Sequence, residues 1–143
     1  MIDFHLKKKA DVTISTIPVA IKDATAFGVI QVQVKYQIIG FQEKPKRPKP
    51  IPGREKEAFA SMENYLFNKD FLIDILYKDA KDKNSSHDFG KDILPKIFNT
   101  SRVYAYDFLR NRIPGISKKE IGYWRDVGTI KAFCEADMDL RSV

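Results

Sequence analysis

The hydrophobic pattern along the first half of this 143-residue chain predicts several β-strands. Val12–Val19 is rich in β-branched and apolar residues, which is typical of a strand buried on both faces. Phe27–Val34 and Gln37–Phe41 predict two further strands. The residues between them, Lys35 and Tyr36, are not the Asn-Gly or Asp-Gly pair of a tight hairpin, so the geometry of this connection stays open.

The second half of the chain mixes strand-like and helical patterns. Ala58–Phe67 and Arg102–Phe108 predict strands, and Gly90–Phe98 predicts a short helix between them. Asn68 is a predicted N-cap for a helix over about 69–78. The side chains expected on the buried face of this helix are Phe71, Leu72, Ile75 and Leu76. Strands that alternate with helices predict an α/β fold with a mainly parallel or mixed sheet.

The remaining segments are the two ends and a proline-rich stretch. Residues 2–6 fit either a strand or a helix that ends at Lys7–Lys9. Lys44–Pro52 holds four prolines and four basic residues and therefore predicts a surface loop. A last helix is predicted to begin near Thr129. Its apolar positions are Ile130, Phe133, Ala136 and Leu140, and Cys134 is also expected in the core.

Composition narrows the class of protein. The length fits one domain or part of one, and 43% hydrophobic residues with 12% aromatic residues can form a core. No apolar run approaches the roughly 18 residues needed to cross a bilayer, and the charges near the N-terminus are in the wrong order for a signal peptide. We therefore expect a soluble, cytoplasmic protein without a membrane partner.

The net charge of +6 favours phosphorylated or polyanionic ligands. Lys7–Lys9 and the loop Lys44–Lys56 could neutralise nucleic-acid phosphates, but no recognition motif accompanies them, so a solvated basic surface is favoured. We expect no nucleic-acid partner. His5 and His87 have no zinc-site spacing, and a single cysteine excludes an internal disulfide.

Two short fragments match protein-kinase signatures. Val19–Lys22 spells the strand motif with the ATP-binding lysine, and Asp88–Gly90 spells the magnesium motif. The Gly-rich loop and the His-Arg-Asp loop of kinases do not accompany them. The kinase interpretation is therefore rejected.

Two other positions suggest phosphate and metal chemistry. Lys44 follows the predicted strand that ends at Phe41, and open α/β sheets bind ligands at the carboxyl ends of their strands. Asp126 stands before Gly128-Thr129, where a carboxylate could bind Mg²⁺ or could simply form a turn before a capped helix. Local chemistry leaves both interpretations of Asp126 open.

Five segments stand out along the chain, in the order Phe27–Val29, Gly40–Pro45, Ala60–Met62, Ser85–Asp92 and Tyr123–Thr129. The longest are Ser85–Asp92, which reads Ser-Ser-His-Asp-Phe-Gly-Lys-Asp, and Tyr123–Thr129, which reads Tyr-Trp-Arg-Asp-Val-Gly-Thr. In this order the five segments closely resemble the bacterial glucose-1-phosphate adenylyltransferases, also called ADP-glucose pyrophosphorylases. The resemblance extends from near residue 1 to Met138-Asp139-Leu140.

This resemblance implies an activity and a fold. The family forms ADP-glucose and pyrophosphate from ATP and glucose 1-phosphate for glycogen synthesis, with Mg²⁺ neutralising the phosphates during an in-line displacement. Its members are homotetramers with a Rossmann-like nucleotidyltransferase domain followed by a left-handed β-helix. The family's Gly-rich, ATP-binding loop and its second magnesium aspartate lie upstream of the segments matched here, and the β-helix lies downstream.

The resemblance also implies roles for individual residues. Lys44 corresponds to the lysine that binds the phosphate of glucose 1-phosphate, and the position of Glu43 contacts the sugar. The positions of Ser61, Tyr65 and Asp88 line the same pocket. The position of Trp124 forms part of the pocket wall, and that of Asp126 binds magnesium together with the upstream aspartate.

Residues 1–143 are therefore expected to form one partial domain, the sugar-phosphate-binding half of a catalytic domain, inactive alone and not tetrameric. The alternative is a non-catalytic basic remnant that binds sugar phosphate or polyanions. Glu63 stands where the family usually has glycine, and a carboxylate there would repel a phosphate and fill space. Gln33–Tyr36 replaces a turn that in the family is often Asp-Glu-Asn-Gly.

Overall fold

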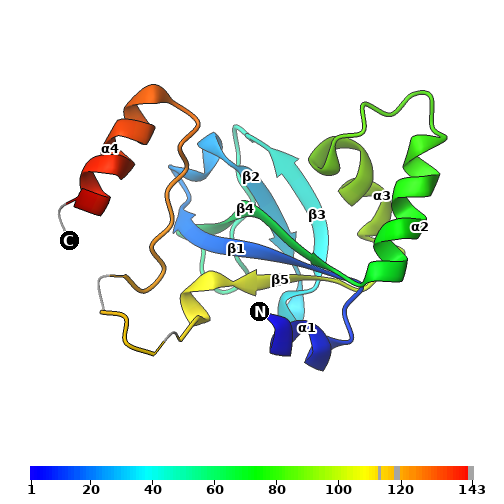
Figure 1. Cartoon of the computed structure of the whole chain (residues 1–143), viewed down its shortest axis with the longest axis horizontal. Coiled ribbons are helices and arrows are strands. Elements are labelled where there is room, and N and C mark those ends of the chain that lie inside the picture. Colours follow the sequence, from blue (N-terminus) through cyan, green and yellow to red (C-terminus); the bar gives the residue numbers. More distant parts are fainter. Residues whose placement is uncertain (113, 118–119, 142–143) are drawn as a thin grey trace. The chain divides into compact units, whose positions relative to one another are not determined.

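The structure, a computed structural model, describes residues 1–112, 114–117 and 120–141, and these form two compact units that divide after Arg110. The first unit contains a five-stranded sheet in the order β3-β2-β4-β1-β5 (Figure 1). The strands are β1 (Val12–Ala20), β2 (Gly28–Val32), β3 (Ile38–Glu43), β4 (Glu57–Phe67) and β5 (Val103–Asp107).

The sheet is mixed, which confirms the α/β prediction, but parallel pairing does not dominate it. Only β1 and β5 pair in parallel, whereas β1–β4, β2–β4 and β2–β3 are antiparallel. Short connections within residues 20–57 reverse the chain without a crossover helix, and such connections favour antiparallel neighbours. The expectation that residues 1–143 form one partial domain stays a prediction.

Helices lie before, between and after these strands. The α-helices are α1 (Ile2–Lys8), α2 (Lys69–Ala80), α3 (Leu94–Ile97) and α4 (Ile130–Arg141). A π-helix, Phe89–Ile93, leads into α3, and 3₁₀ turns occupy Ala24–Ala26, Val34–Tyr36 and Phe108–Arg110. The opening segment is thus a helix, and it ends where Lys9 adopts a left-handed conformation and its N–H meets the carbonyls of His5 and Leu6.

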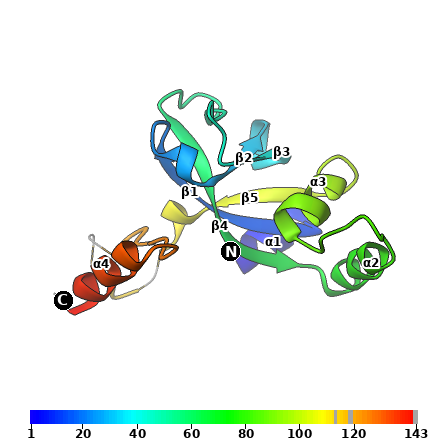
Figure 2. The same cartoon turned by 90° about the horizontal axis from the view of Figure 1, so that it is seen from above.

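Strand β1 is buried on both faces, as predicted. Val12 and Ile14 belong to the core that side chains of α2 and α3 complete. Thr13, on the opposite face, meets α1, where its hydroxyl lies 2.8 Å from Nδ1 of the buried His5. Phe4 of α1 packs edge-on against Tyr106 of β5 on that face. Figures 1 and 2 show α2 and α3 side by side at one end of the sheet.

The predicted face of α2 is only partly correct. Asn68 caps the helix by accepting hydrogen bonds from the backbone N–H groups of Asp70 and Phe71, at 3.1 and 3.4 Å. Ile75 is buried, and Phe71 and Leu72 pack against the core. Leu76, however, is 40% exposed, and the helix continues to Ala80 instead of ending at Lys78.

The β2–β3 connection is tight although it lacks the expected sequence. Lys35 and Tyr36 both have φ of 65°, the left-handed conformation that Asn and Gly adopt most easily. The Tyr36 ring packs on the buried Phe59, and Arg110 donates a 2.9 Å hydrogen bond to its hydroxyl. We infer that these contacts compensate for the unfavourable backbone of a non-glycine residue.

Strand β4 carries a bulge in its middle. Ile14 pairs with Tyr65 and Thr16 pairs with Ser61, so Ser15 alone faces residues 62–64. Within the bulge Glu63 has φ of 57°. A position with positive φ in a bulge favours glycine because glycine has no Cβ to clash. The structure thus gives a backbone reason for the glycine that the resemblance associates with this position.

The second unit has little buried side-chain surface among its described residues. Thr129 caps α4 as predicted, because its hydroxyl accepts a 3.1 Å hydrogen bond from the Ala132 N–H. The predicted core positions of this helix are not buried, and Phe133 is 62% exposed. Cys134 is also exposed, which contradicts its expected place in a core.

Candidate functional site

Four of the seven predicted site residues meet in one pocket of the first unit. Glu43 reaches it from the end of β3, Ser61 and Tyr65 from β4, and Asp88 from the loop before the π-helix. The pocket has a volume of about 470 Å³. Its lining consists of Phe41, Glu43, Ser61, Glu63, Tyr65, His87, Asp88, Phe89, Gly90 and Lys91.

Lys44 lies beside this pocket rather than in its lining. Its Nζ is 3.7 Å from Oε1 of Glu43, and both side chains are more than half exposed. The Lys44 N–H hydrogen-bonds to the carbonyl of Phe27 at 3.2 Å, so the backbone is anchored where β3 ends. An anchored backbone with an exposed ammonium group suits a residue that binds an incoming phosphate.

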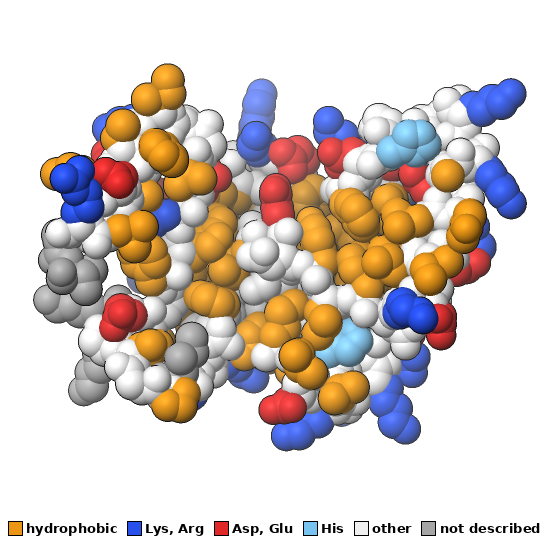
Figure 3. All heavy atoms as spheres, in the orientation of Figure 1, with side chains coloured by type: hydrophobic (Ala, Val, Ile, Leu, Met, Phe, Trp, Pro, Cys, Tyr) orange, Lys and Arg blue, Asp and Glu red, His pale blue; other side chains and the backbone are white. Residues whose placement is uncertain are grey.

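The interior of the pocket is acidic and hydroxyl-rich. Glu43, Glu63 and Asp88 contribute carboxylates and Lys91 contributes one ammonium group. Figure 3 shows acidic side chains near the end of β3 and the helical segment that leads into α3. Ionised carboxylates only accept hydrogen bonds, so they match the hydroxyl groups of a sugar and oppose the entry of a phosphate. The pocket therefore suits a ligand rich in hydroxyl groups better than an anionic one.

The surroundings of Tyr65 change the pKa of its phenol. Burial raises the pKa of its phenol above the ordinary value, and the negative charge of Glu63 raises it further. A hydrogen bond with the Ser61 side chain acts in the opposite direction. Tyr65 therefore remains a neutral hydroxyl that can donate to or accept from a sugar oxygen.

Aromatic rings form the apolar wall of the pocket. Tyr65 stacks on Phe89 with ring centroids 5.7 Å apart, and Phe67 packs at an angle against both. On the other side, Phe41 lies so close to Gly28 that a Cβ there would be 2.6 Å from its Cζ. Gly28, in the first matched segment, therefore makes room for a pocket-lining ring.

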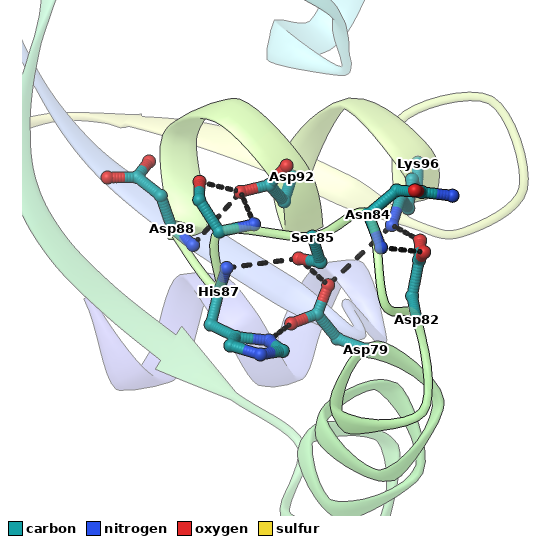
Figure 4. A network of polar contacts seen from close by, with 9 residues as sticks. Asp79, Asp82, Asn84, Ser85, His87, Asp88, Asp92 and Lys96 are labelled. Carbon is teal, nitrogen blue, oxygen red and sulfur yellow. Dashed lines mark hydrogen bonds and ion pairs between the residues drawn. The ribbon is translucent and has the colours of Figure 1, made fainter.

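The loop that carries Asp88 is fixed by two other aspartates (Figure 4). Asp92 accepts hydrogen bonds from the Ser86 hydroxyl at 2.5 Å and from the N–H groups of Ser86 and Asp88 at 3.1 Å. Asp79, at the end of α2, binds the Ser85 hydroxyl and the His87 ring, both at 2.7 Å. These bonds lower the pKa of both aspartates, chiefly through His87 for Asp79 and Ser86 for Asp92.

The last two predicted site residues belong to the second unit. Asp126 is exposed and Trp124 is half-buried, in the irregular segment before Thr129. Arg125, between them, forms an ion pair with Asp139 of α4. Their assignment to the site stays a prediction.

No group of three or more potential metal ligands occurs among residues 1–112, 114–117 and 120–141. The described chain thus supplies no complete metal site by itself. Asp126 offers a single carboxylate, which fits Mg²⁺ only where substrate phosphates or other carboxylates complete the coordination. In the same part of the chain, none of the helices has the length and apolarity needed to cross a membrane.

Sequence reasoning missed several residues of this site. Phe89, Gly90 and Lys91 line the pocket, and their place in the string Ser85–Asp92 was the available signal. Asp79 lies just beyond the predicted end of the helix at 78, although it follows the buried Ile75 by four residues and hence lies on the same helix face. A carboxylate on the buried face of a helix needs partners, and that requirement could have marked it.

Comparison with known families shows the family of the chain. The profile of the nucleotidyl transferase family matches residues 1–143, which is the whole chain. The chain belongs to the nucleotidyl transferase family. The mixed α/β sheet is consistent with part of such a domain.

Three relatives in the comparison share one name. The chain is 52% identical over 142 residues to the glucose-1-phosphate adenylyltransferase of Photobacterium profundum, 51% identical over 144 residues to that of Thermus thermophilus and 54% identical over 140 residues to that of Aliivibrio fischeri. These alignments cover 98–100% of the chain but 34–35% of each relative. The chain thus spans about a third of the length of these adenylyltransferases.

Proposed function

We propose that this chain is the sugar-phosphate-binding part of a glucose-1-phosphate adenylyltransferase, which converts ATP and glucose 1-phosphate into ADP-glucose and pyrophosphate. The observation that carries the proposal is the meeting of Glu43, Ser61, Tyr65 and Asp88 in one pocket with Lys44 at its edge. The identity of about half of all residues to enzymes of that name supports it.

Binding of glucose 1-phosphate follows from the charges at the pocket. The sugar hydroxyls donate hydrogen bonds to Glu43 and Asp88, and the ring packs on the aromatic wall. The phosphate stays at the edge, where the Lys44 ammonium group neutralises it. Glu63 opposes this arrangement, because its carboxylate faces the same pocket and repels the phosphate.

In the proposed reaction an oxygen of the sugar phosphate attacks the α-phosphorus of ATP. A phosphorus–oxygen bond to glucose 1-phosphate forms as the bond to pyrophosphate breaks. Lys44 lowers the repulsion between the two phosphates, and Trp124 contributes to the wall of the site. Asp126 would be one ligand of Mg²⁺, which supplies further charge neutralisation when bound. A cytoplasmic location follows for an enzyme that consumes ATP and a sugar phosphate.

Isothermal titration calorimetry of the 143-residue chain with glucose 1-phosphate tests this proposal. We expect saturable binding that glucose alone and inorganic phosphate alone reproduce only weakly, because each lacks half of the contacts. A chain that binds none of the three ligands would refute the sugar-phosphate site.

The catalytic part of the proposal needs a longer protein as the assay. In a chimera, this chain replaces the matching 144 residues of the Thermus thermophilus relative. We expect the chimera to form ADP-glucose from ATP and glucose 1-phosphate. A folded chimera without turnover, paired with a chain that binds glucose 1-phosphate, would favour a binding role without catalysis.

The second candidate function is a non-catalytic module that binds sugar phosphate or polyanions. It is favoured by the four basic side chains of the proline-rich loop, Lys44, Lys46, Arg47 and Lys49, all of which are exposed. Binding to nucleic acid that weakens steeply with salt, together with no response to glucose 1-phosphate, would support this function over the adenylyltransferase.

A further inference from the structure

Asp79 is a buried carboxylate that the proposed reaction does not use. It lies near the end of α2, only 6% exposed and outside the lining of the pocket. Its Oδ1 accepts a 2.7 Å hydrogen bond from the Ser85 hydroxyl and its Oδ2 lies 2.7 Å from Nδ1 of His87. Lys96 of α3 approaches Oδ1 to 3.6 Å. Burying this charge requires such partners, but it does not require that two of them come from a single loop.

The contact with His87 determines which ring nitrogen carries a proton. An ionised carboxylate is only an acceptor, so Nδ1 of His87 must be protonated to donate to Asp79. The Ser85 hydroxyl, which donates to Asp79, also accepts a 3.0 Å hydrogen bond from the His87 backbone N–H. Asp79, Ser85 and His87 therefore form a closed set of three hydrogen bonds.

This set fixes an unfavourable backbone conformation next to the pocket. His87 has φ of 61°, in the left-handed region that costs a non-glycine residue about 1 kcal/mol or more. Such a conformation persists only where its surroundings impose it. The His87 ring contacts Asp79 and the His87 backbone N–H donates to Ser85, and these two contacts hold the conformation.

The turn at His87 sets the direction of the next side chain. Figure 4 shows the Asp88 carboxylate pointing away from the Asp79 network, and Asp88 lines the pocket. Its Oδ1 accepts a 2.8 Å hydrogen bond from the Lys91 N–H, which caps the π-helix. Rotation of the turn would therefore move the Asp88 carboxylate and the start of the helix that carries Phe89.

We propose that Asp79 is a positioning residue for the sugar-binding site, which acts through Ser85 and His87 to aim Asp88 into the pocket. The proposal rests on the proposed function of that pocket. It assigns to a residue of α2, which does not touch the sugar, a contribution to the affinity for glucose 1-phosphate.

Asp82 provides a matched control. It also pairs with Lys96, at 2.8 Å, and it also accepts a backbone hydrogen bond in the same loop, from the Asn84 N–H at 3.0 Å. Its side chain bonds to Asn84 and Lys96 rather than to Ser85 or His87, and only its backbone carbonyl, which Asp82→Asn leaves in place, accepts a 3.1 Å hydrogen bond from the Ser85 N–H. Asp79→Asn and Asp82→Asn therefore each weaken an ion pair with Lys96, but only Asp79→Asn disturbs the set that holds the turn.

The experiment compares the affinity of both variants for glucose 1-phosphate by calorimetry of the whole chain, with Tm measured in parallel. We expect Asp79→Asn to weaken binding by about tenfold or more and Asp82→Asn to leave it within about twofold. Equal affinities of the two variants, or a loss in both that follows the fall in Tm, would overturn the proposal.

A second variant guards against misfolding of Asp79→Asn. His87→Asn keeps a residue that tolerates positive φ while it removes the imidazole. His87 also lines the pocket, so His87→Asn can weaken binding more than Asp79→Asn does. We expect the double variant to bind as His87→Asn alone does, because the imidazole through which Asp79 acts is already absent there. Additive losses would contradict the proposal.

Nitrogen-15 NMR of the ligand-free chain separates this proposal from the proposed function. We expect a protonated Nδ1 on His87 in the parent chain, and amide shifts at Asp88 and Phe89 that change in Asp79→Asn but not in Asp82→Asn. If the parent chain fails to bind glucose 1-phosphate, the proposed function falls while these spectra still decide whether Asp79 holds the turn. Unchanged amide shifts in Asp79→Asn would overturn the positioning role.

Discussion

The strings Ser85–Asp92 and Tyr123–Thr129 carry the resemblance to adenylyltransferases equally, yet the structure gives them different surroundings. In the first string, Ser85, Ser86 and His87 each bond to an aspartate that shapes the loop. In the second, Asp126 and Val127 are exposed, and the hydroxyl of Thr129 caps the following helix.

This difference shows that two motifs of similar length and specificity can consist of their particular residues for different physical reasons. Residues of Ser85–Asp92 are needed to build the turn that carries Asp88, so the fold explains most of them. In the second string Asp126 is exposed. Its proposed role as a metal ligand therefore predicts that changing it affects turnover without affecting stability.

The largest effect is expected when Asp126 is replaced. If this effect were absent, the contrast drawn between the two strings would be wrong. In the chimera with the Thermus thermophilus relative, Asp126→Ala should lower kcat by about 100-fold or more, because it removes a group that neutralises charge during phosphoryl transfer. Steady-state kinetics and Tm measure the two consequences. Asp137→Ala, which removes an exposed α4 carboxylate paired with Arg141, is the control and should change neither. Full activity of Asp126→Ala would disprove the metal-ligand role.

Lys44 is, like Asp126, an exposed residue with a proposed role in the reaction. Replacing it should affect the kinetics less than replacing Asp126 does. Lys44→Ala removes a charge-assisted contact to the phosphate and should raise KM in the chimera about 10-fold to 100-fold with little change in kcat. Calorimetry on the 143-residue chain should show the same loss of affinity. Lys46→Ala, on the same loop and equally exposed, should have little effect, and an equal loss in both variants would point to a general basic surface instead.

Asp92 belongs to the first string, Ser85–Asp92, whose residues are explained by their contacts in the fold. Asp92→Ala leaves the N–H groups of Ser86 and Asp88 without their acceptor and should lower Tm by about 3 °C near neutral pH.

The pH dependence of that loss gives a second readout. The hydrogen bonds from Ser86 lower the pKa of Asp92 in the folded chain, so the stability that they contribute is fully present above the unfolded pKa of about 3.9. It disappears as the pH falls through the folded pKa. The Tm difference between parent and variant should therefore shrink on acidification, and a constant difference down to pH 2 would contradict this assignment.

The smallest effect is expected when Glu63 is replaced. This position separates the effect of an unfavourable backbone conformation from the effect of a charge in the pocket. Glu63→Gly should stabilise the chain by about 1 kcal/mol in urea unfolding, because it relieves a non-glycine residue at φ of 57°. It should also strengthen glucose 1-phosphate binding by removing a carboxylate from the pocket. Asn64→Gly, the next position in the strand, should instead destabilise the chain. Equal effects of the two variants would show that the bulge does not disfavour glutamate.

Much of the local structure was predictable because it depends on near neighbours. The cap at Asn68 needs only the next three residues, and the double burial of β1 follows from an apolar run in one segment. The antiparallel pairing of β4 with β1 and β2 was not predictable from alternation alone. It depends on how intervening loops turn, and Lys35 and Tyr36 turn sharply without the residues that usually signal it.

The sequence by itself determined the family, the order of elements and the residue types of a sugar-phosphate site. Those properties are carried by strings such as Gly40–Pro45 and by hydrophobic periodicity, both of which are local. Only the tertiary structure decided that Glu43, Tyr65 and Asp88 share one pocket and that Asp79 bonds to the His87 ring beside it. Such contacts join residues that are distant along the chain, and their geometry depends on strand pairing, the bulge at Glu63 and helix packing, which no local pattern specifies.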